Sequence, residues 1–325
     1  MKVHVFYHDR CFDGACSAAV FSRFYRECID SSAEFVYSGL VHKASSLFDE
    51  SLCGPGENAI VDFKYTASPK ITWWFDHHIS AFLTPDDRAH FEADRSGKKF
   101  FDPHYKSCTK FIADTASSKF GFNTKPIGDL IYWADIVDGA QYKDAPTAVG
   151  MAEPAMKLTL VIEANQDDEF PKKLIPLLTE MPLADILKQP FVAEKLPMLL
   201  ERHRGSIDII KKNSECIDGT IFMDVTAYDL EAYNKFVPYY LYPQATYNVG
   251  LSMSSFRTKV SVGTNPWTTT PADKLLNLAA ICERYGGGGH ARVGAISFPR
   301  EDAAKARDAA HVIVNELREA MRKTK

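Results

Sequence analysis

The first 80 residues alternate between strand-like and helix-like stretches joined by short connections, and this order constrains the fold most strongly. Strands are predicted at 2–8, 33–40, 58–63 and 70–75, and helices at 15–28 and 43–52. Strand–helix–strand order with short connections places the strands in a parallel sheet that carries helices on its faces. The sequence therefore predicts an α/β fold for this part of the chain.

A second alternating pattern begins after a largely helical region. Helices are expected at 107–121, at 126–139 and through most of 151–213, then strands at 219–228, 245–253, 258–264 and 293–298, with helices at 271–285 and 301–322. A chain of 325 residues is long for one compact domain, so two domains are expected. We predict a first domain over 1–190, a helical linker over 191–216 and a smaller α/β domain over 217–325.

The composition is that of an ordinary globular protein, with 46% hydrophobic and 25% charged residues. No apolar run approaches the length of about 18 residues that a membrane span needs, and the start of the chain carries no secretory signal. The seven cysteines are scattered, odd in number and free of CxxC pairs, which fits reduced thiols better than disulfides. We expect a cytoplasmic protein without a membrane segment.

The charge is weakly acidic and unevenly placed. The net charge of −4 argues against extensive electrostatic binding of duplex nucleic acid. Residues 217–325 carry 13 basic and 11 acidic side chains, so the acidic excess lies before them. An acidic first part could hold cations, while a slightly basic second part could meet phosphate. This balance suits short substrates better than long polymers.

Acidic residues and histidines follow three of the predicted strands, where each strand ends. They are His8, Asp13, Asp62, Asp76, His77 and His78. The carboxyl ends of parallel strands meet at one edge of a sheet, where ligands bind. Carboxylates gathered there would repel one another unless cations lay between them. Oxygen-rich ligands with a minority of histidine suit Mn²⁺ or Mg²⁺, and two such ions about 3.5–4 Å apart serve hydrolysis at phosphorus.

Each of these residues also has a simpler interpretation. A single Asp at a strand end usually caps a helix or forms a turn. The preceding Trp73, Trp74 and Phe75 are more typical of a buried core than of a platform for stacking. The convergence of several groups on one edge is what favours a metal site.

A glycine run near the C-terminus is a second candidate site. Gly286, Gly287, Gly288 and Gly289 are followed by His290 and Arg292, and Arg257 stands at the start of a predicted strand. One glycine would suffice to end the preceding helix, and exposed N–H groups of a glycine run can cradle an anion. A long helix cap with incidental basic neighbours is the alternative. Because the run follows a helix, it is no P-loop or dinucleotide fingerprint.

These motifs together resemble the DHH–DHHA1 phosphoesterase superfamily over nearly the whole chain. "FDHHIS" at 75–80 and "GGGGH" at 286–290 match the two hallmark motifs, in order and about 210 residues apart. "HDRCFDGACSA" at 8–18 and "AIVDF" at 59–63 are similar to the first and second motifs. The resemblance implies an N-terminal parallel-sheet DHH domain, a helical linker and a smaller C-terminal α/β DHHA1 domain, with an active-site cleft between them.

The resemblance also implies roles for individual residues. His8, Asp13, Asp62 and His77 would be ligands of two Mn²⁺ ions, with Asp62 shared between them and Mg²⁺ as the alternative ion. Asp76 would orient a histidine, and His78 would contact the substrate phosphate or a metal. Asp62, His77 and His78 would form the catalytic group. Arg257, the glycine run, His290 and Arg292 would bind the far phosphate.

Two positions depart from the family pattern. Many members carry a further Asp where this chain has Cys11. A thiolate could ligate there, water could take the place, or one metal position could be weak. The fourth motif is ambiguous between Asp135 and Asp138, which stand at i,i+3 on a helix and can face one side. Asp135 is our first choice, and both are predicted as candidate ligands.

The expected activity is metal-dependent hydrolysis of phosphodiester bonds in short single-stranded oligonucleotides or dinucleotides by a metal-activated water. Members of the superfamily include exonucleases, cyclic dinucleotide phosphodiesterases, pyrophosphatases and polyphosphatases. The alternatives are therefore a polyphosphatase or pyrophosphatase, or a nucleotide-binding module that has lost its chemistry because of Cys11. Duplex DNA and membranes are not expected partners.

Overall fold

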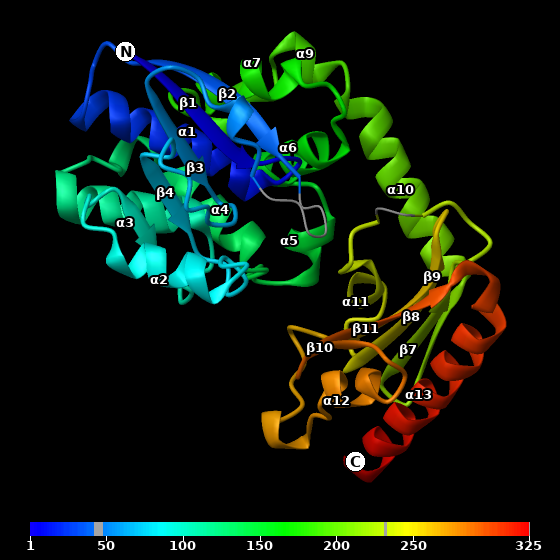
Figure 1. Ribbon diagram of the computed structural model, residues 1–325. Coiled ribbons are helices and arrows are strands. Elements are labelled where there is room, and N and C mark those ends of the chain that lie inside the picture. Colours follow the sequence, from blue (N-terminus) through cyan, green and yellow to red (C-terminus); the bar gives the residue numbers. More distant parts are fainter. Residues whose placement is uncertain (42–47, 231–232, 325) are drawn as a thin grey trace. The chain divides into compact units, whose positions relative to one another are not determined.

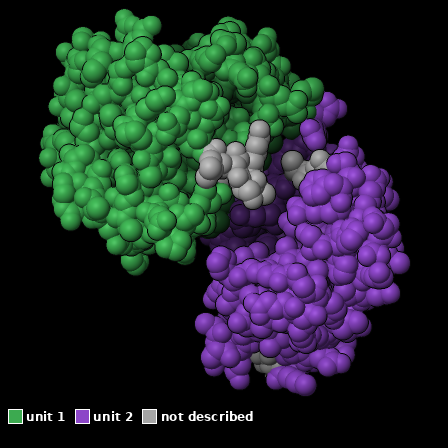
Figure 2. Space-filling view, viewed as in Figure 1, with its two compact units in different colours: residues 1–142, 151–199 green, residues 143–150, 200–325 purple. Residues whose placement is uncertain are grey.

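The structure is a computed structural model that describes residues 1–41, 48–230 and 233–324. The chain divides into two compact units, which Figure 2 shows in green and purple. Unit 1 comprises residues 1–142 and 151–199, and unit 2 comprises residues 143–150 and 200–325. The division falls within helix α10 (Leu196–Lys212), inside the segment that the sequence predicts as a linker.

Unit 1 is built on a five-stranded sheet in the order β2-β1-β3-β4-β5, in which all neighbouring strands run parallel. The strands are β1 (Lys2–His8), β2 (Glu34–Leu40), β3 (Glu57–Val61), β4 (Trp73–Asp76) and β5 (Lys99–Phe101). The predicted parallel sheet is confirmed. The strand order reverses between β1 and β3, and sheets of this kind bind ligands beyond the carboxyl ends of the strands at such a point.

Figure 1 shows the helices of unit 1 around the sheet, and the helix over Pro85–Ala93 was not predicted from the sequence. They are α1 (Phe12–Cys28), α2 (Pro85–Ala93), α3 (Cys108–Phe120), α4 (Gly128–Asp138), α6 (Pro154–Ala164), α7 (Glu169–Leu178), α8 (Leu183–Ile186) and α9 (Pro190–Ala193), with 3₁₀ turns η1 (Glu50–Leu52) and η2 (Lys125–Ile127). Helix α1 packs against β1, α3 and α4. The predicted helix over 43–52 lies largely outside the described residues.

The aromatic residues before the His pair are part of the core, as predicted. Trp73 and Phe75 belong to the main cluster, while Trp74 belongs to a second cluster with Phe6 and Ile60. All three side chains of the triplet are at most 1% exposed. Because successive strand residues point to opposite faces, burial of all three means that both faces of β4 are covered. The end of this strand is therefore held rigidly.

Unit 2 contains a six-stranded sheet in the order β10-β11-β9-β8-β7-β6. The strands are β6 (Ser214–Ile217), β7 (Thr220–Asp224), β8 (Tyr247–Met253), β9 (Arg257–Thr264), β10 (Gly288–His290) and β11 (Val293–Pro299), and the other elements are α5 (Ala145–Val149), α11 (Val237–Leu241), α12 (Leu278–Glu283), α13 (Ala303–Thr324), η3 (Ala272–Lys274) and η4 (Arg300–Asp302). Among the described strands of this sheet, only β7 and β8 pair in parallel, and the other neighbours are antiparallel. Val249, Val260 and Val262 of the sheet pack with Ile313 and Leu317 of α13.

The helix predicted over 271–285 is much shorter in the structure. A 3₁₀ turn occupies Ala272–Lys274, and α12 begins only after Asn277. The side chain of Asn277 accepts a hydrogen bond from the N–H of Ala280, which is the geometry of a helix N-cap inside the predicted helix. Across the three described ranges, no helix combines the length and the apolar character that crossing a membrane requires.

Candidate metal centre

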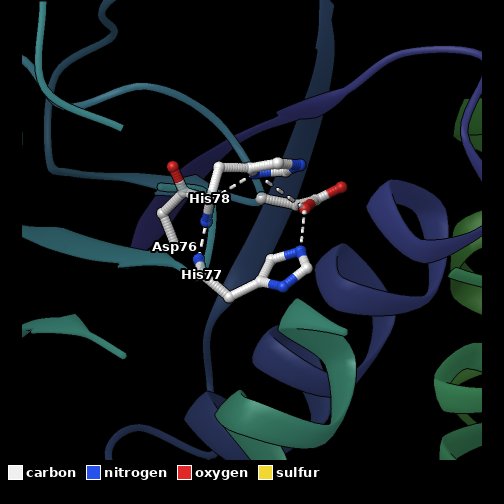
Figure 3. A group of neighbouring side chains, drawn as sticks. Asp76, His77 and His78 are labelled. Carbon is white, nitrogen blue, oxygen red and sulfur yellow. Dashed lines mark hydrogen bonds and ion pairs between the residues drawn. The ribbon is translucent and has the colours of Figure 1, made fainter. Parts of the chain in front are cut away.

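Polar side chains from the ends of β1, β3 and β4 and from nearby helices converge next to the point where the strand order reverses. Three overlapping sets have ligand atoms within 4.8 Å of one another: Asp62, Asp76, His77 and His78; His8, Cys11 and Asp62; and Asp13, His77 and Asp138. Figure 3 shows Asp76, His77 and His78 at the end of β4. The two imidazole rings lie beside each other, with ring centroids 4.4 Å apart.

Asp62 lies at the centre of this group, directly after β3. Its φ of +57° turns the chain, and its N–H donates to the carbonyl of Phe75 at 2.9 Å. The carboxylate is 1% exposed, and neither oxygen makes a hydrogen bond with any described residue. Oδ2 lies 3.5 Å from Nδ1 of His8, whereas Oδ1 lies 3.5 Å from Nε2 of His77. The two oxygens of Asp62 therefore face two different sets of side chains.

His77 presents a single nitrogen to three carboxylates. Its Nδ1 lies 3.1 Å from the carbonyl oxygen of Tyr105, and because a carbonyl can only accept, Nδ1 carries the proton. Nε2 lies 3.4 Å from Asp138, 3.5 Å from Asp62 and 3.9 Å from Asp13. It is buried without a hydrogen bond from the described part of the chain. A backbone carbonyl that fixes the tautomer in this way is typical of a metal-bound histidine.

Asp13 is held between two helices. Its carboxylate accepts hydrogen bonds from the N–H groups of Cys108 at 2.7 Å and Thr109 at 3.1 Å, which open α3. The next residue, Gly14, lets α1 start close to β1, since a Cβ there would collide with the carbonyl oxygen of His8. This close approach brings the end of β1 and the start of α1 into one site.

Asp76 orients the histidines that follow it. Its Oδ1 accepts hydrogen bonds from the N–H of His77 at 2.8 Å, from the N–H of His78 at 3.2 Å and from Nδ1 of His78 at 2.7 Å. Since Nδ1 of His78 donates to Asp76, the basic lone pair of this ring lies on Nε2. Asp76 is thus placed as the residue that sets the tautomer and orientation of His78.

The structure distinguishes the two acidic residues of α4. Oδ1 of Asp135 accepts a hydrogen bond from the hydroxyl of Ser107 at 3.1 Å, so Asp135 supports the start of α3. Asp138, one turn later, is the residue whose carboxylate faces His77. Our first choice from sequence was Asp135, but the packing of α4 against α3 assigns the position in the cluster to Asp138.

This arrangement fits divalent cations. Ligand atoms that share one cation at about 2.0–2.5 Å stand about 3–4 Å apart, which matches the spacing around Nε2 of His77. Buried carboxylate oxygens without hydrogen bonds are costly unless a cation satisfies them. Carboxylates with a minority of imidazoles are the donors that Mn²⁺ and Mg²⁺ accept. His8, Asp13, Asp62, His77 and Asp138 are therefore candidate ligands.

No protein-family model and no curated protein matches the chain, but solved structures match nearly all of it. A pGpG-specific phosphodiesterase, PggH from Vibrio cholerae, is similar with a TM-score of 0.66 and 18% identity, covering 97% of this chain and 99% of that one. The DHH domain of PF0399, a member of the s1p family of ribosomal proteins, is similar with a TM-score of 0.61 and 12% identity, covering 96% and 86%. The chain has the DHH-domain fold.

A third DHH-like structure is RecJ from Thermus thermophilus in complex with Mn²⁺, with a TM-score of 0.50 and 12% identity. The match covers 97% of this chain but 52% of RecJ. The resemblance that the motifs predict is thereby confirmed at the level of the fold. The eponymous Asp-His-His triplet of the DHH fold begins here with the last residue of β4 and continues into the loop that follows it.

The electrostatics of the DHH site show that its carboxylates need positive charge. Burial and the charges of Asp62 and Asp138 raise the pKa of Asp13, and burial with the charge of Asp62 raises the pKa of Asp138 to about 6. Burial alone would lower the pKa of His77, but Asp62 and Asp13 outweigh it and raise the pKa to about 10. The hydrogen bond to Asp76 raises the pKa of His78. Without a cation, protonated imidazoles supply the charge that the carboxylates require.

In unit 2, backbone packing accounts for most of the glycine run. Gly286 follows α12 with a φ of +74°. A Cβ on Gly287 would collide with the carbonyl oxygen of Ala295, and one on Gly289 would collide with that of Val293. No described atom lies within 4 Å of the place where the Cβ of Gly288 would be, and the φ of Gly288 is not positive. Only Gly288 of the run therefore has neither a conformational nor a packing reason to be glycine.

The basic residues predicted around this run do not all lie together. His290 and Arg292 are exposed beside the turn between β10 and β11. Arg257 stands at the other end of β9, because it pairs with Pro299 whereas Gly263 pairs with Val293. Six residues of strand separate the two ends, which is about 20 Å.

Sequence reasoning missed three contributors to these sites. The carbonyl of Tyr105 and the N–H groups of α3 are main-chain groups, so no side-chain pattern could reveal them. Lys259 is the third, since it stands two residues after Arg257 on β9 and shares its face of the strand. The alternation in "RTKVSV" at 257–262 was the available signal.

Proposed function

We propose that this protein is a metal-dependent phosphoesterase that hydrolyses phosphodiester bonds in short oligonucleotides or dinucleotides. The observation that carries the proposal is the cluster in which buried Asp13 and Asp62 and the exposed Asp138 surround Nε2 of His77. Its central atoms are buried without hydrogen bonds among the described residues. A structural role alone would leave this cluster strongly unfavourable, whereas bound cations would satisfy it.

The resident group would be two divalent cations, Mn²⁺ or alternatively Mg²⁺. Such ions, when bound, activate a water molecule and neutralise charge on phosphoryl oxygens. His8, Asp13, Asp62, His77 and Asp138 would hold them, with Asp62 common to both because its two oxygens face different sets of ligands. Mn²⁺ in the similar RecJ structure supports this choice.

The chain's own residues position the substrate. His78, oriented by Asp76, would contact a phosphoryl oxygen through the nitrogen that does not donate to Asp76. In unit 2, two separate groups are candidates to bind a more distant phosphate: Arg257 with Lys259 at the start of β9, and His290 and Arg292 with the backbone of Gly288 near its other end.

The acidic balance of the chain and the absence of a basic stripe in the sequence favour a short substrate. PggH, described as a pGpG-specific phosphodiesterase, supports the same size class. The cytoplasmic location expected from the sequence stays a prediction.

The deciding experiment is nucleotide release from pApA and pGpG by the full chain, in Mn²⁺ and again in EDTA. Mononucleotide should appear in Mn²⁺ alone, and His77→Ala should abolish it. His104→Ala is the matched control, because this histidine is 92% exposed and pairs only with nearby Asp102 among the described residues. Undiminished turnover by His77→Ala would refute the assignment of the site.

Substrate length and chemistry form the second half of the test. A dinucleotide should be cleaved faster than a long single strand at equal concentration of ends. Faster cleavage of the long strand would contradict the size class. Phosphate release from pyrophosphate or polyphosphate, with no release from either dinucleotide, would replace the phosphodiesterase with an inorganic phosphohydrolase. Metal binding without any turnover would leave a nucleotide-binding module.

A further inference from the structure

Cys11 lies inside the candidate metal centre, although the activity proposed above gives it no role. Its Sγ, a ring nitrogen of His8 and a carboxylate oxygen of Asp62 all lie within 4.8 Å of one another. His8 of this set faces Oδ2 of Asp62, while His77 faces Oδ1. The thiol therefore lies with the His8 group of the centre.

The local fold directs this side chain into the site. Cys11 is the N-cap residue of α1, with extended φ and ψ of −123° and 133°, and its side chain makes no capping hydrogen bond. Ser, Thr, Asp or Asn would be favoured there if capping were the purpose. Close packing of Gly14 on His8 holds the start of α1 against the end of β1, so the thiol stays next to His8.

A second observation points to a ligand at the same place. Asp62 is 1% exposed, and its Oδ2, which faces His8, makes no hydrogen bond with a described residue. A buried carboxylate oxygen of this kind requires a proton or a cation. Sulfur, imidazole nitrogen and carboxylate oxygen around one point form a mixed donor set.

We propose that Cys11 is a thiolate ligand of the cation held by His8 and Asp62, and that this position prefers a softer divalent ion of the Zn²⁺, Co²⁺ or Fe²⁺ class. The position around Asp13, His77 and Asp138 keeps the preference for Mn²⁺ or Mg²⁺. The inference rests on the proposed function, since it concerns one half of the same centre. Thiolates select such ions because they are soft donors, whereas carboxylates suit hard ions.

Coordination at Cys11 is a simple exchange of proton for metal. The S–H bond breaks, the proton leaves to solvent and a sulfur lone pair binds the cation, with no change in the oxidation state of either partner.

Cobalt is the probe that separates this inference from the function. We expect metal-free full-length protein titrated with Co²⁺ to develop a near-ultraviolet sulfur-to-cobalt charge-transfer band, together with visible d–d bands. Cys11→Ser should remove the charge-transfer band and keep the d–d bands of the remaining site. Cys28→Ser is the matched control, because Cys28 ends the same helix far from the centre, and its spectrum should equal that of the wild type.

Competition between Zn²⁺ and Mn²⁺ for the protein tests the proposed metal preference. In Cys11→Asp, the ratio of Zn²⁺ to Mn²⁺ retained after equilibrium dialysis should fall by about tenfold or more, since changes around metal sites shift affinity by about 10–100-fold. Full Co²⁺ binding without the charge-transfer band, or an unchanged ratio in Cys11→Asp, would overturn the thiolate assignment and leave the phosphoesterase intact. Absence of any bound Co²⁺ would overturn both.

Discussion

The end of β4 in unit 1 and the glycine run of unit 2 look equally diagnostic in the sequence, yet the structure supports them unequally. At the end of β4, Asp62 and His77 are buried with polar atoms that no described residue satisfies. In the glycine run, Gly286, Gly287 and Gly289 have conformational or packing reasons to be glycine. A motif is strong evidence for a ligand when its residues remain unexplained by the protein itself.

The variant Asp62→Asn is expected to have the largest effect, and it tests whether the group at the end of β4 binds metal. Asparagine tolerates a φ of +57° and keeps the shape of the side chain, so the turn after β3 should survive. The loss of the shared carboxylate should lower kcat/KM by about 10²–10³-fold or more. Steady-state kinetics on pApA in Mn²⁺ would measure it, with Asp102→Asn as an exposed control. Activity within a few-fold of the wild type would remove Asp62 from the centre.

A second test compares Asp138→Asn with Asp135→Asn. The pKa of Asp138 is raised from 3.8 to about 6, so its ionised form destabilises the metal-free fold. This loss of stability is absent below about pH 4, because the carboxyl group is then protonated in both the folded and the unfolded state. It is complete above about pH 6, where the carboxyl group is ionised in both states. Asp138→Asn should therefore stabilise the metal-free protein by about 1–2 kcal/mol at pH 8, because solvent screening at this exposed residue reduces the effect of the full pKa shift.

The same pair of variants should behave oppositely when metal is added. Mn²⁺ should raise the melting temperature of the wild type and of Asp135→Asn more than that of Asp138→Asn, because binding to the folded state stabilises it. Asparagine at 135 can still accept from Ser107, so little change is expected there. Thermal unfolding at pH 4 and pH 8, with and without Mn²⁺, gives all four comparisons. Equal responses of the two variants would contradict the assignment of Asp138.

Local features of the fold were predictable from the sequence, whereas features set by contacts between distant segments were not. The parallel sheet was predictable because β1, β3 and β4 are apolar runs that end in polar residues. Strand β5 was not, since three residues over Lys99–Phe101 carry too little pattern. The choice between Asp135 and Asp138 was undecidable from helical spacing, because a contact with Ser107 across two helices separates them.

The glycine run shows a different limit. Four glycines before a histidine indicated an anion site, because the sequence alone does not show which main chain packs against them. In the structure, strand β11 packs against them, and its carbonyl groups account for Gly287 and Gly289. The glycines of the motif therefore have a role, but for most of them it is to let β10 pack against β11.

The release of protons on metal binding is a third test of the centre in unit 1, with a smaller expected effect, because a metal ion must displace the protons on its ligands. The pKa of His77 is about 10, so the metal-free protein carries a proton there at neutral pH, and a ligating imidazole must lose it. Binding of Mn²⁺ should release at least one proton, and affinity should fall as the pH falls, more steeply below about pH 6 where Asp138 also takes up a proton. Calorimetry in two buffers of different ionisation enthalpy measures the release. Identical apparent enthalpies would mean that His77 is no ligand.

The smallest expected effect decides whether the glycine run binds anything. Gly288 is the one glycine of the run whose Cβ would meet no described atom and whose φ is not positive, so Gly288→Ala should leave the free energy of unfolding within about 0.5 kcal/mol. Gly287→Ala should cost about 1–3 kcal/mol, because its Cβ collides with β11.

If phosphate approaches the backbone at Gly288, the methyl group of Gly288→Ala obstructs it and KM rises about fivefold, equivalent to about 1 kcal/mol, with kcat unchanged. We expect this rise, since open space at a glycine has no packing purpose. An unchanged KM would make the whole run a structural device, and the ligand-binding evidence would then lie in unit 1.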